Sequence, residues 1–284
     1  MANKLKLGIL HTTIREDEKL LIKQAVGSQF DLAVMDGRYI VYNPSACDAR
    51  YDMVLERCMS ATVGIQATLF FESLGIKTVN SSKVSRNCEN KFLTSLLFAE
   101  HKITTVPFAL VFNEEMAKKA VDQLGGYPIV VKPVSGSWGR LLAKVNDEDA
   151  LEGIIEQKLV LGSPIQKALY LQKYIEKPER DIRAVIVGNQ LICAIYRYSS
   201  HWITNTARGA KAVNCQVDGD LRKICLNTAD AVGGGILGID IFETDDGYLV
   251  NEVNHTMEFK NVQRATGVNV AAEIIDYLKK AAKK

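Results

Sequence analysis

Paired cysteines are missing from this sequence. Its six cysteines form no C-x-x-C pair and are scattered as single thiols: Cys47, Cys58, Cys88, Cys193, Cys215 and Cys225. This spacing favours neither a zinc site within the chain nor a disulfide framework. An apolar run of about 18 residues, which a membrane span would need, is also missing, and no signal peptide is found. We therefore expect a soluble protein in a reducing, cytoplasmic setting.

The sequence also lacks a large excess of positive or negative charge. The net charge is only +2 over 284 residues, which is too small to indicate bulk binding of nucleic acid. The lysines at 279–284 make the tail locally basic, but such lysines more often complement the dipole of a helix end. With 47% hydrophobic and 24% charged residues, the chain has the composition of an ordinary globular protein, long enough for two or three small domains.

Short strands alternate with helices along the first third of the chain. Strands are predicted at 4–10, 30–35, 51–55 and 76–79, with helices at 16–26 and 63–74. This order indicates a parallel α/β domain over 1–88. A helix carrying Lys91 opens a second α/β unit over 89–167, with helices at 113–124 and 147–158 and strands at 127–133 and 140–145. The last unit, 168–284, begins with strands at 168–175, 181–187 and 191–198. It continues with a helix at 218–231, a hairpin at 238–254 and a helix from 268.

The hairpin GIDIFETDDGYLVNEVN predicts a divalent-metal site. Asp245-Asp246-Gly247 suits a three-residue loop, a type I turn followed by left-handed glycine. This loop would pair Thr244 with Tyr248, Phe242 with Val250, and Asp240 with Glu252. The two-residue period then places Asn254 on the same face as the two carboxylates. Because unpaired carboxylates so close would repel, a cation between them is expected, and oxygen ligands favour Mg²⁺ or Mn²⁺. A solvated acidic hairpin is the alternative.

Residues 127–140, YPIVVKPVSGSWGR, form an apolar strand ending at Lys132 and a loop with Gly136 and Gly139. No G-K-[S/T] follows the glycines, so the loop is not a Walker A motif. A lysine on the strand and glycines in the next turn instead suggest a lid over phosphates, whose backbone N–H groups approach the oxygens without Cβ clashes. Taken alone, the loop is better explained as an ordinary β-turn, and the downstream carboxylates are what favour the phosphate lid.

Arginines gather on a second predicted hairpin. A two-residue turn at Gly188-Asn189 would pair Val187 with Gln190 and Arg183 with Ala194, leaving Arg197 near Arg180. Guanidinium groups hold oxyanions in bidentate fashion and keep their proton, which suits a phosphate and an acyl phosphate. The alternative is a row of surface ion pairs. The polar loop 205–211 shows neither a helical nor a strand period.

Taken in order, these motifs resemble the signature of ATP-grasp ligases over essentially the whole chain. The motifs are Lys91, Lys132, the 136–139 loop, QKYI at 172–175, Arg183, Asn205, Asp240, Glu252 and Asn254. The Asp-Ile-Arg strand and the Asn-Glu-Val-Asn ending are similar to the RimK-like group. NEVNHTMEFKN at 251–261 further resembles the LysX family, which joins α-aminoadipate to the carrier protein LysW in lysine biosynthesis; the sister ArgX family uses glutamate.

Two positions bear on the choice between these families. After Glu-Phe-Lys, the aminoadipate type has Asn-Thr or Asn-Ser, and the glutamate type has Gly-Phe. This chain has Asn261-Val262, so the first position matches the aminoadipate type and the second matches neither. The half-match favours α-aminoadipate and leaves glutamate, or both, open.

The resemblance implies an α/β ATP-grasp fold with three subdomains and ATP between the central and C-terminal ones. It implies ATP contacts from Lys91 and Lys132, a phosphate lid from Ser135, Gly136, Ser137, Trp138 and Gly139, and an adenine-binding hinge from Gln172, Lys173, Tyr174 and Ile175. Asp181, or Glu179, would accept from the ribose hydroxyls. Asp240, Glu252 and Asn254 would hold Mg²⁺, Asn205 would reach nucleotide or Mg²⁺, and Arg183 and Arg197 would stabilise an acyl phosphate. Arg208, a candidate for a substrate carboxylate, would meet the substrate together with His255, Thr256 and Asn261.

The implied reaction phosphorylates a carboxylate with ATP, and an amine then displaces the phosphate to give an amide. The implied partners are an amino acid and a small acidic carrier protein, without nucleic acid or membrane, and related ligases are homotetramers or homodimers. Two alternatives stay open. One is a RimK-type ligase that adds glutamate to another protein or peptide, and the other is a non-catalytic nucleotide-binding regulator.

Overall fold

The computed structural model describes residues 4–28, 30–46, 50–136, 140–204 and 209–282. The N-terminal sheet is parallel, with strand order β2-β1-β3-β4. Its strands are β1 (Leu5–His11), β2 (Phe30–Asp36), β3 (Met53–Arg57) and β4 (Lys77–Val79), and its helices are α1 (Glu16–Val26) and α2 (Ala61–Ser73). Short 3-10 turns, η1 (Gly37–Tyr39) and η2 (Pro44–Ala46), follow β2. The predicted alternation of strand and helix is therefore present in this part of the chain.

The central sheet is antiparallel, with order β5-β8-β6-β7. It comprises β5 (Phe108–Val111), β6 (Ile129–Pro133), β7 (Ala143–Val145) and β8 (Leu169–Lys173), with helices α5 (Glu114–Gln123) and α6 (Glu148–Leu161) and a turn η3 (Pro164–Lys167). Asn113 and Asp147 begin the two helices, because their side chains accept from the N–H groups of Met116 and Ala150. Since β8 pairs with both β5 and β6, the central sheet extends to Lys173, beyond the predicted boundary at 167/168.

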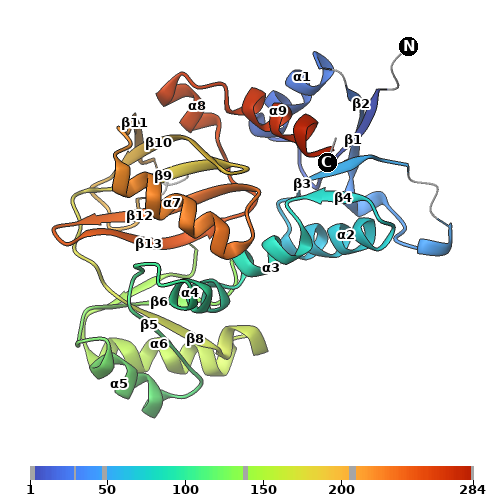
Figure 1. The fold of residues 1–284 in the computed structure, drawn as a ribbon. Helices are drawn as coiled ribbons and strands as arrows, with labels where there is room; N and C mark the ends of the chain where they lie inside the picture. The colour runs from blue at the N-terminus through green and yellow to red at the C-terminus, as the bar shows by residue number, and fades with distance from the viewer. Residues whose placement is uncertain (1–3, 29, 47–49, 137–139, 205–208, 283–284) are drawn as a thin grey trace.

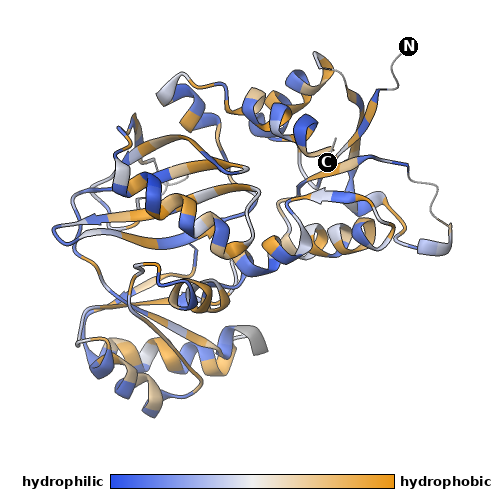
Figure 2. Cartoon of the chain, in the orientation of Figure 1, coloured by the Kyte–Doolittle hydropathy of each residue, from blue (hydrophilic) through white to orange (hydrophobic). Residues whose placement is uncertain are grey.

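The C-terminal sheet has the order β11-β10-β9-β12-β13. Its strands are β9 (Arg180–Val187), β10 (Gln190–Tyr198), β11 (Lys211–Asn214), β12 (Ile236–Thr244) and β13 (Gly247–Asn254). Side chains alternate along β9: Ile182, Ala184 and Ile186 pack with α7 (Gly219–Val232), whereas Val185 and Val187 join a core on the other face. Figure 2 shows hydrophobic residues along these strands and a mixture of hydrophobic and hydrophilic residues on the covering helices.

The end of the chain returns to its beginning. After β13, α8 (Lys260–Thr266) leads to α9 (Val270–Ala282), which packs against α1 beside the N-terminal sheet (Figure 1). One apolar core therefore joins Leu7 and Leu21 of the N-terminal unit to Val185 of β9 and Ile275 of α9. Helices α3 (Ser82–Glu89) and α4 (Lys91–Glu100) connect the N-terminal unit to the rest.

Both predicted hairpins are present, but each contains a β-bulge. In β12–β13 the loop is the two residues Asp245-Asp246, so that Thr244 pairs with Gly247 and Phe242 with Leu249. The predicted three-residue loop and its first two pairs are therefore wrong. An extra residue on β13, Asn251, restores the predicted pairing of Asp240 with Glu252. The bulge moves Asn251 out of the regular alternation of β13.

The β9–β10 hairpin begins as predicted, with Val187 opposite Gln190. A bulge between Leu191 and Cys193 then shifts the register by one residue. As a result Arg183 lies opposite Ile195 and not Ala194, and Arg197 lies opposite Asp181 and not near Arg180. The predicted cluster of three guanidinium groups is wrong, because Arg180 pairs with Glu243 at the outer end of the strands.

The described part of the chain contains no helix that is both long and apolar enough to span a membrane. The cysteines within the described ranges are free and buried: Cys58, Cys88, Cys193, Cys215 and Cys225. Elements that the sequence patterns did not indicate are α3, β5, β11 and α8.

Candidate functional site

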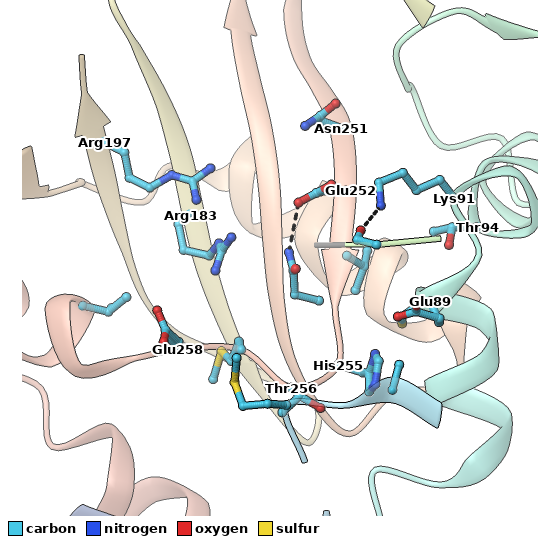
Figure 3. A pocket seen from close by; sticks show the side chains of 18 of the residues that line it. Glu89, Lys91, Thr94, Arg183, Arg197, Asn251, Glu252, His255, Thr256 and Glu258 are labelled. Carbon is cyan, nitrogen blue, oxygen red and sulfur yellow. Dashed lines mark hydrogen bonds between the residues drawn. The ribbon is translucent and has the colours of Figure 1, made fainter. Parts of the chain in front are cut away.

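Two cavities meet along β13. The smaller, about 90 Å³, lies between the central and C-terminal sheets, and the larger, about 290 Å³, lies between the C-terminal sheet and the N-terminal unit (Figure 3). Five residues line both cavities: Lys91, Gly136, Arg197, Asn251 and Glu252. The two cavities therefore adjoin at this shared boundary.

The smaller cavity combines apolar walls with a few polar groups. Ile175 and Phe242 line it together with the paired rings of Tyr174 and Trp202, whose centroids lie 6.4 Å apart. The Nζ of Lys144 lies 3.6 Å from the centroid of the Tyr174 ring. Apolar and aromatic walls with a few polar groups are typical of sites for flat, aromatic ligands such as a nucleotide base.

Lys132 projects from β6 into this cavity, and only 7% of its surface is exposed. Its Nζ donates to Oδ1 of Asn251 over 2.9 Å, which is the contact that the β13 bulge provides. Burial lowers the pKa of Lys132 to about 8, against the opposing effect of the Glu252 charge. A buried ammonium group without a carboxylate hydrogen-bond partner suits an anionic ligand such as a phosphate.

Two arginines and two aspartates form a buried network between the cavities. Arg197 binds Asp181 in bidentate fashion, with distances of 2.6 and 2.7 Å, and also lies 3.1 Å from Asp240. Arg183 donates to both carboxylate oxygens of Asp240. Burial raises the pKa of Asp240, but the charges of Arg183 and Arg197 outweigh this effect and lower it to about 2. Four charges in one network hold the two guanidinium planes in fixed positions.

This network removes one assumption behind the metal prediction, namely that Asp240 and Glu252 are two unpaired carboxylates. Asp240 is neutralised by two arginines, so the expected pair of unpaired carboxylates is not present. Among the described residues, no three His, Cys, Asp or Glu side chains come together as a metal-binding group. Glu252 is half-buried, and its contact with Asn254 is a 3.5 Å hydrogen bond. A single carboxylate with an amide oxygen nearby fits Mg²⁺, which in nucleotide sites takes one or two carboxylates and completes its shell with phosphates and water.

The larger cavity is assembled from three parts of the chain. The N-terminal unit and the end of α3 supply Arg15, Met59 and Glu89, the C-terminal sheet supplies Arg183 and Arg197, and the segment after β13 supplies residues 255–258 together with Asn261 and Val262. Figure 3 shows Arg183 and Arg197 on one side of Glu252 and Lys91 on the other, with Glu258 and Glu89 facing one another across the space. This cavity offers both cationic and anionic groups, as a zwitterionic ligand requires.

The RimK-like ATP-grasp domain matches residues 88–278, and the LysX preATP-grasp domain matches residues 7–86. The chain belongs to the RimK-like ATP-grasp family. Two curated relatives come from Sulfurisphaera tokodaii. The α-aminoadipate–LysW ligase LysX is 35% identical over 98% of this chain and 99% of its own length, and the glutamate–LysW ligase ArgX is 31% identical over 97% and 98%. This RimK-like chain is therefore an ATP-dependent ligase of carboxylate and amine groups.

Solved structures share the ATP-grasp fold. A RimK domain protein from Sphaerobacter thermophilus gives a TM-score of 0.81 at 22% identity, covering 96% of this chain and 98% of its own. The ATP complex of the D-alanine–D-alanine ligase from Bacillus anthracis gives 0.72 at 16% identity, covering 98% and 97%. The α/β ATP-grasp fold expected from the sequence is thereby confirmed.

Most of the predicted nucleotide residues of this ATP-grasp chain line the smaller cavity. They are Lys91, Lys132, Gly136, Gln172, Lys173, Tyr174, Ile175, Asp181 and Arg197. Ser135 forms an isolated bridge with Asn90 beside it. Gln172 donates to the Tyr170 hydroxyl. Asp181 accepts from Arg197 and Thr204, and its contact with a ribose stays a prediction. Ser137, Trp138, Gly139, Asn205 and Arg208 lie outside the described residues.

Of the predicted substrate residues, His255, Thr256 and Asn261 all line the larger cavity. The main-chain oxygen of His255 accepts from Asn80, and the Thr256 hydroxyl donates to Glu56. Sequence reasoning missed the N-terminal residues of this region, above all Arg15 and Asp17. Their only signal was an acidic first helical turn, which the helix dipole explains by itself.

Proposed function

We propose that this ligase joins the amino group of α-aminoadipate to the side-chain carboxylate of the C-terminal Glu of a LysW-type carrier protein, in lysine biosynthesis. The observation that carries the proposal is the meeting, at Lys91, Arg197 and Glu252, of two cavities: one with aromatic walls and a buried lysine, and one lined by both cationic and anionic groups. The names of the relatives LysX and ArgX support the carrier and the amino-acid class.

ATP would occupy the smaller cavity. Tyr174 and Ile175 would contact the base, and the main chain at 172–175 would meet its polar edge. Lys132 and Lys91 would hold the phosphates, Lys132 from β6 and Lys91 from the first turn of α4, where its Nζ now donates to the oxygen of Gly136 in the lid. A phosphate that displaced this contact would couple nucleotide binding to the position of the lid.

Glu252 and Asn254, with Asp240 beside them, would hold Mg²⁺, or Mn²⁺ in its place. When bound, the ion would neutralise negative charge on the phosphates. The position of Arg183 and Arg197 against Asp240 keeps both guanidinium groups aimed at the boundary between the cavities. There they would bind the acceptor carboxylate next to the terminal phosphate.

The reaction proceeds in two transfers. An oxygen of the acceptor carboxylate attacks the γ-phosphorus of ATP, and ADP leaves with the electrons of the broken P–O bond. The amine nitrogen then attacks the carbonyl carbon of the acyl phosphate and loses a proton, and inorganic phosphate departs. Arg183 and Arg197 would stabilise the negative charge in both steps. None of these steps needs a covalent enzyme nucleophile, so the buried cysteines have no role in them.

Asn261 and Val262 favour α-aminoadipate over glutamate, because Val262 lines the cavity without the bulk of the phenylalanine found in the glutamate type. The extra methylene of α-aminoadipate limits discrimination by a pocket to about 1–3 kcal/mol. The alternative, a glutamate–LysW ligase or a dual ligase, is supported by the similarity to ArgX. We also expect a cytoplasmic homo-oligomer.

ADP release with a purified LysW-type carrier, ATP and Mg²⁺ tests this function, with α-aminoadipate and glutamate supplied separately. We expect release to require both carrier and amine, and kcat/KM to be at least about 10-fold higher with α-aminoadipate. A clear preference for glutamate assigns the ArgX activity, and equal turnover assigns a dual ligase. Release that occurs with a peptide acceptor but not with the carrier contradicts the proposal and favours a RimK-type ligase.

A further inference from the structure

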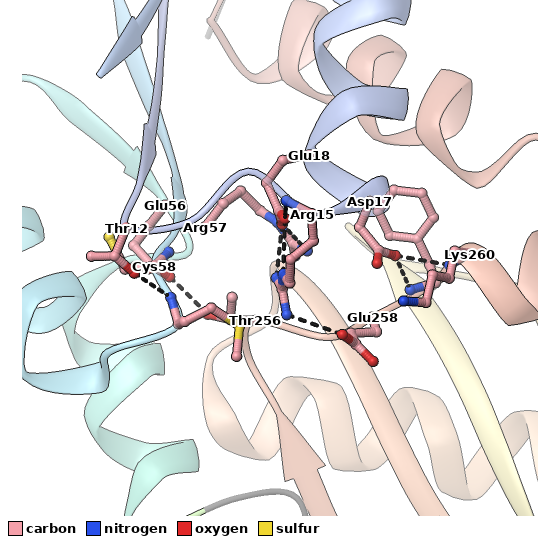
Figure 4. Close-up of polar contacts among 12 residues, drawn as sticks. Thr12, Arg15, Asp17, Glu18, Glu56, Arg57, Cys58, Thr256, Glu258 and Lys260 are labelled. Atoms are coloured by element: carbon pink, nitrogen blue, oxygen red, sulfur yellow. Dashed lines mark hydrogen bonds and ion pairs between the residues drawn. The ribbon is translucent and has the colours of Figure 1, made fainter. Parts of the chain in front are cut away.

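Residues 255–258 line the larger cavity, and the segment 255–260 forms several hydrogen bonds with the N-terminal unit (Figure 4). Asn80 donates to the oxygen of His255 over 2.6 Å, and Thr256 donates to Glu56 on β3 over 2.8 Å. Arg15 donates to Glu258 over 3.2 Å. The N–H groups of Phe259 and Lys260 both donate to Asp17. Each of these contacts joins the N-terminal unit to the 255–260 segment, which is distant from it in sequence.

Asp17 is the most buried member of this set. Its exposed fraction is 0%, and its Oδ1 accepts from the N–H of Phe259 at 2.6 Å and of Lys260 at 2.8 Å. These N–H groups begin α8 and have no partner within the helix, so Asp17 satisfies them from outside. Its second oxygen, Oδ2, is buried without a hydrogen-bond partner among the described residues. One carboxylate oxygen therefore fixes the point at which the cavity wall turns into α8.

The position of Asp17 is itself held by charges around it. Glu18, the next residue, accepts from both Arg15 and Arg57, and Arg15 continues to Glu258. Burial raises the pKa of Glu18, but hydrogen bonding by Arg15 and the charge of Arg57 outweigh it and lower the pKa to about 2. Glu18 therefore stays charged over the neutral pH range, and its contacts with Arg15 and Arg57 hold the first turn of α1 in place.

The wall of the smaller cavity does not depend on the N-terminal unit. The described residues that line it all fall between Lys91 and Glu252, so the N-terminal unit contributes none of its wall. A change at Asp17 should reach the amine cavity through the 255–260 segment and leave the nucleotide cavity unaltered.

We propose that Asp17 is a positioning residue for the amine substrate, acting through the main chain of Phe259 and Lys260. This inference rests on the proposed function in assigning the larger cavity to a dicarboxylic amino acid. Asp17 touches no substrate. It fixes the wall against which the amine is oriented for attack on the acyl phosphate, and orientation errors of about 1 Å can reduce rates on the order of 100-fold.

Asp17→Ala, Asp17→Asn and Glu16→Ala form a matched set in the complete chain. Asp17→Ala removes the acceptor, whereas Asp17→Asn retains an oxygen that accepts the same two N–H groups. Glu16→Ala is the control, because Glu16 is an exposed carboxylate in the same helical turn that pairs with Arg264 on α8 but does not line the cavity. Steady-state ADP release would give KM separately for ATP and for the amine that wild type uses best, chosen from α-aminoadipate, glutamate and other amino acids.

We expect Asp17→Ala to raise KM for the amine at least about 10-fold while KM for ATP stays within about two-fold. Asp17→Asn should recover most of the loss, and Glu16→Ala should match wild type. Equal changes in both KM values, or an unchanged KM for the amine, would overturn the proposal. If Asp17→Ala does not fold, Glu56→Gln takes its place, since a glutamine oxygen cannot accept from both Cys58 N–H and Thr256 as Glu56 does.

Amide hydrogen exchange separates this inference from the assignment of the substrate. Without any substrate present, the N–H groups of Phe259 and Lys260 should exchange faster in Asp17→Ala than in wild type or Glu16→Ala. Unchanged protection in Asp17→Ala contradicts the role of Asp17 whatever the enzyme ligates. Faster exchange together with inactivity of wild type on the carrier contradicts only the proposed function.

Discussion

The two cavities on either side of β13 are built in different ways. The described wall of the nucleotide cavity comes from residues 91–252, within the RimK-like ATP-grasp domain. The wall of the amine cavity also draws on Arg15 and Met59 of the LysX preATP-grasp domain, which in addition holds the 255–260 segment in place. Under the proposed function, we therefore expect the N-terminal domain to influence which amine is accepted and not how the carboxylate is activated.

Glu252→Gln should weaken metal binding at the boundary that both cavities share. A neutral amide cannot compensate a cation as a carboxylate does, so we expect kcat to fall at least about 100-fold at saturating ATP. Glu243→Gln is the matched control, because Glu243 lies on the same hairpin but pairs with Arg180 away from both cavities. ADP release at millimolar Mg²⁺ measures both variants. Near wild-type turnover by Glu252→Gln contradicts the metal assignment.

Lys132→Met should affect the nucleotide cavity alone. The methionine keeps the apolar stem but removes the ammonium group, so we expect kcat/KM for ATP to fall on the order of 10- to 100-fold. KM for the amine and the melting temperature should change little. Lys119→Met, an exposed change in α5 of the same central unit, is the control. A large drop in melting temperature with normal ATP kinetics assigns Lys132 a structural role instead.

Asn261→Gly combined with Val262→Phe should affect the amine cavity alone. Val262 is 2% exposed and contacts both the cavity and the core, so a phenylalanine there shortens the space for the side chain of the amine. We expect the ratio of kcat/KM for α-aminoadipate to that for glutamate to fall about 10-fold. KM for ATP is the internal control. A ratio that stays constant means that the two positions do not set the choice.

The order of strands and helices was predicted closely from sequence patterns, whereas strand register was not. Helix α1 was predicted at its observed bounds, because a periodic apolar face and an acidic first turn are local signals. The β12–β13 loop is one residue shorter than predicted, and the bulge at Asn251 adds one back, so Asp240 still meets Glu252. The errors in loop length and in regular register therefore cancelled at Asp240 and Glu252. In β9–β10 a single bulge had no counterpart, and the neighbours of Arg183 and Arg197 were therefore wrong.

The amine site was less predictable for a different reason. Its wall depends on contacts between residues about 200 or more positions apart, such as Thr256 with Glu56 and Phe259 with Asp17. No local pattern marks an acidic residue in a helical turn as the partner of a distant main chain, because the same residue stabilises its own helix. The pairing of Asp240 with arginines escaped prediction likewise, since an acidic hairpin does not show which cations will neutralise it.

The smallest effect concerns pH and the network around Glu18. Its pKa in the folded protein is about 2, below its ordinary value of 4.5. A lowered carboxylate pKa stabilises the fold fully above the ordinary value and loses this contribution as pH falls toward 2. We therefore expect the free energy of unfolding to decrease by on the order of 1–3 kcal/mol from this group between about pH 4.5 and 2. Urea unfolding at pH 7, 4.5 and 3 measures it, and Glu18→Gln should flatten this part of the decline. An equally steep decline in the free energy of unfolding of Glu18→Gln would mean that other carboxylates cause the loss of stability at low pH. The contacts of Glu18 with Arg15 and Arg57 would then contribute little to acid stability.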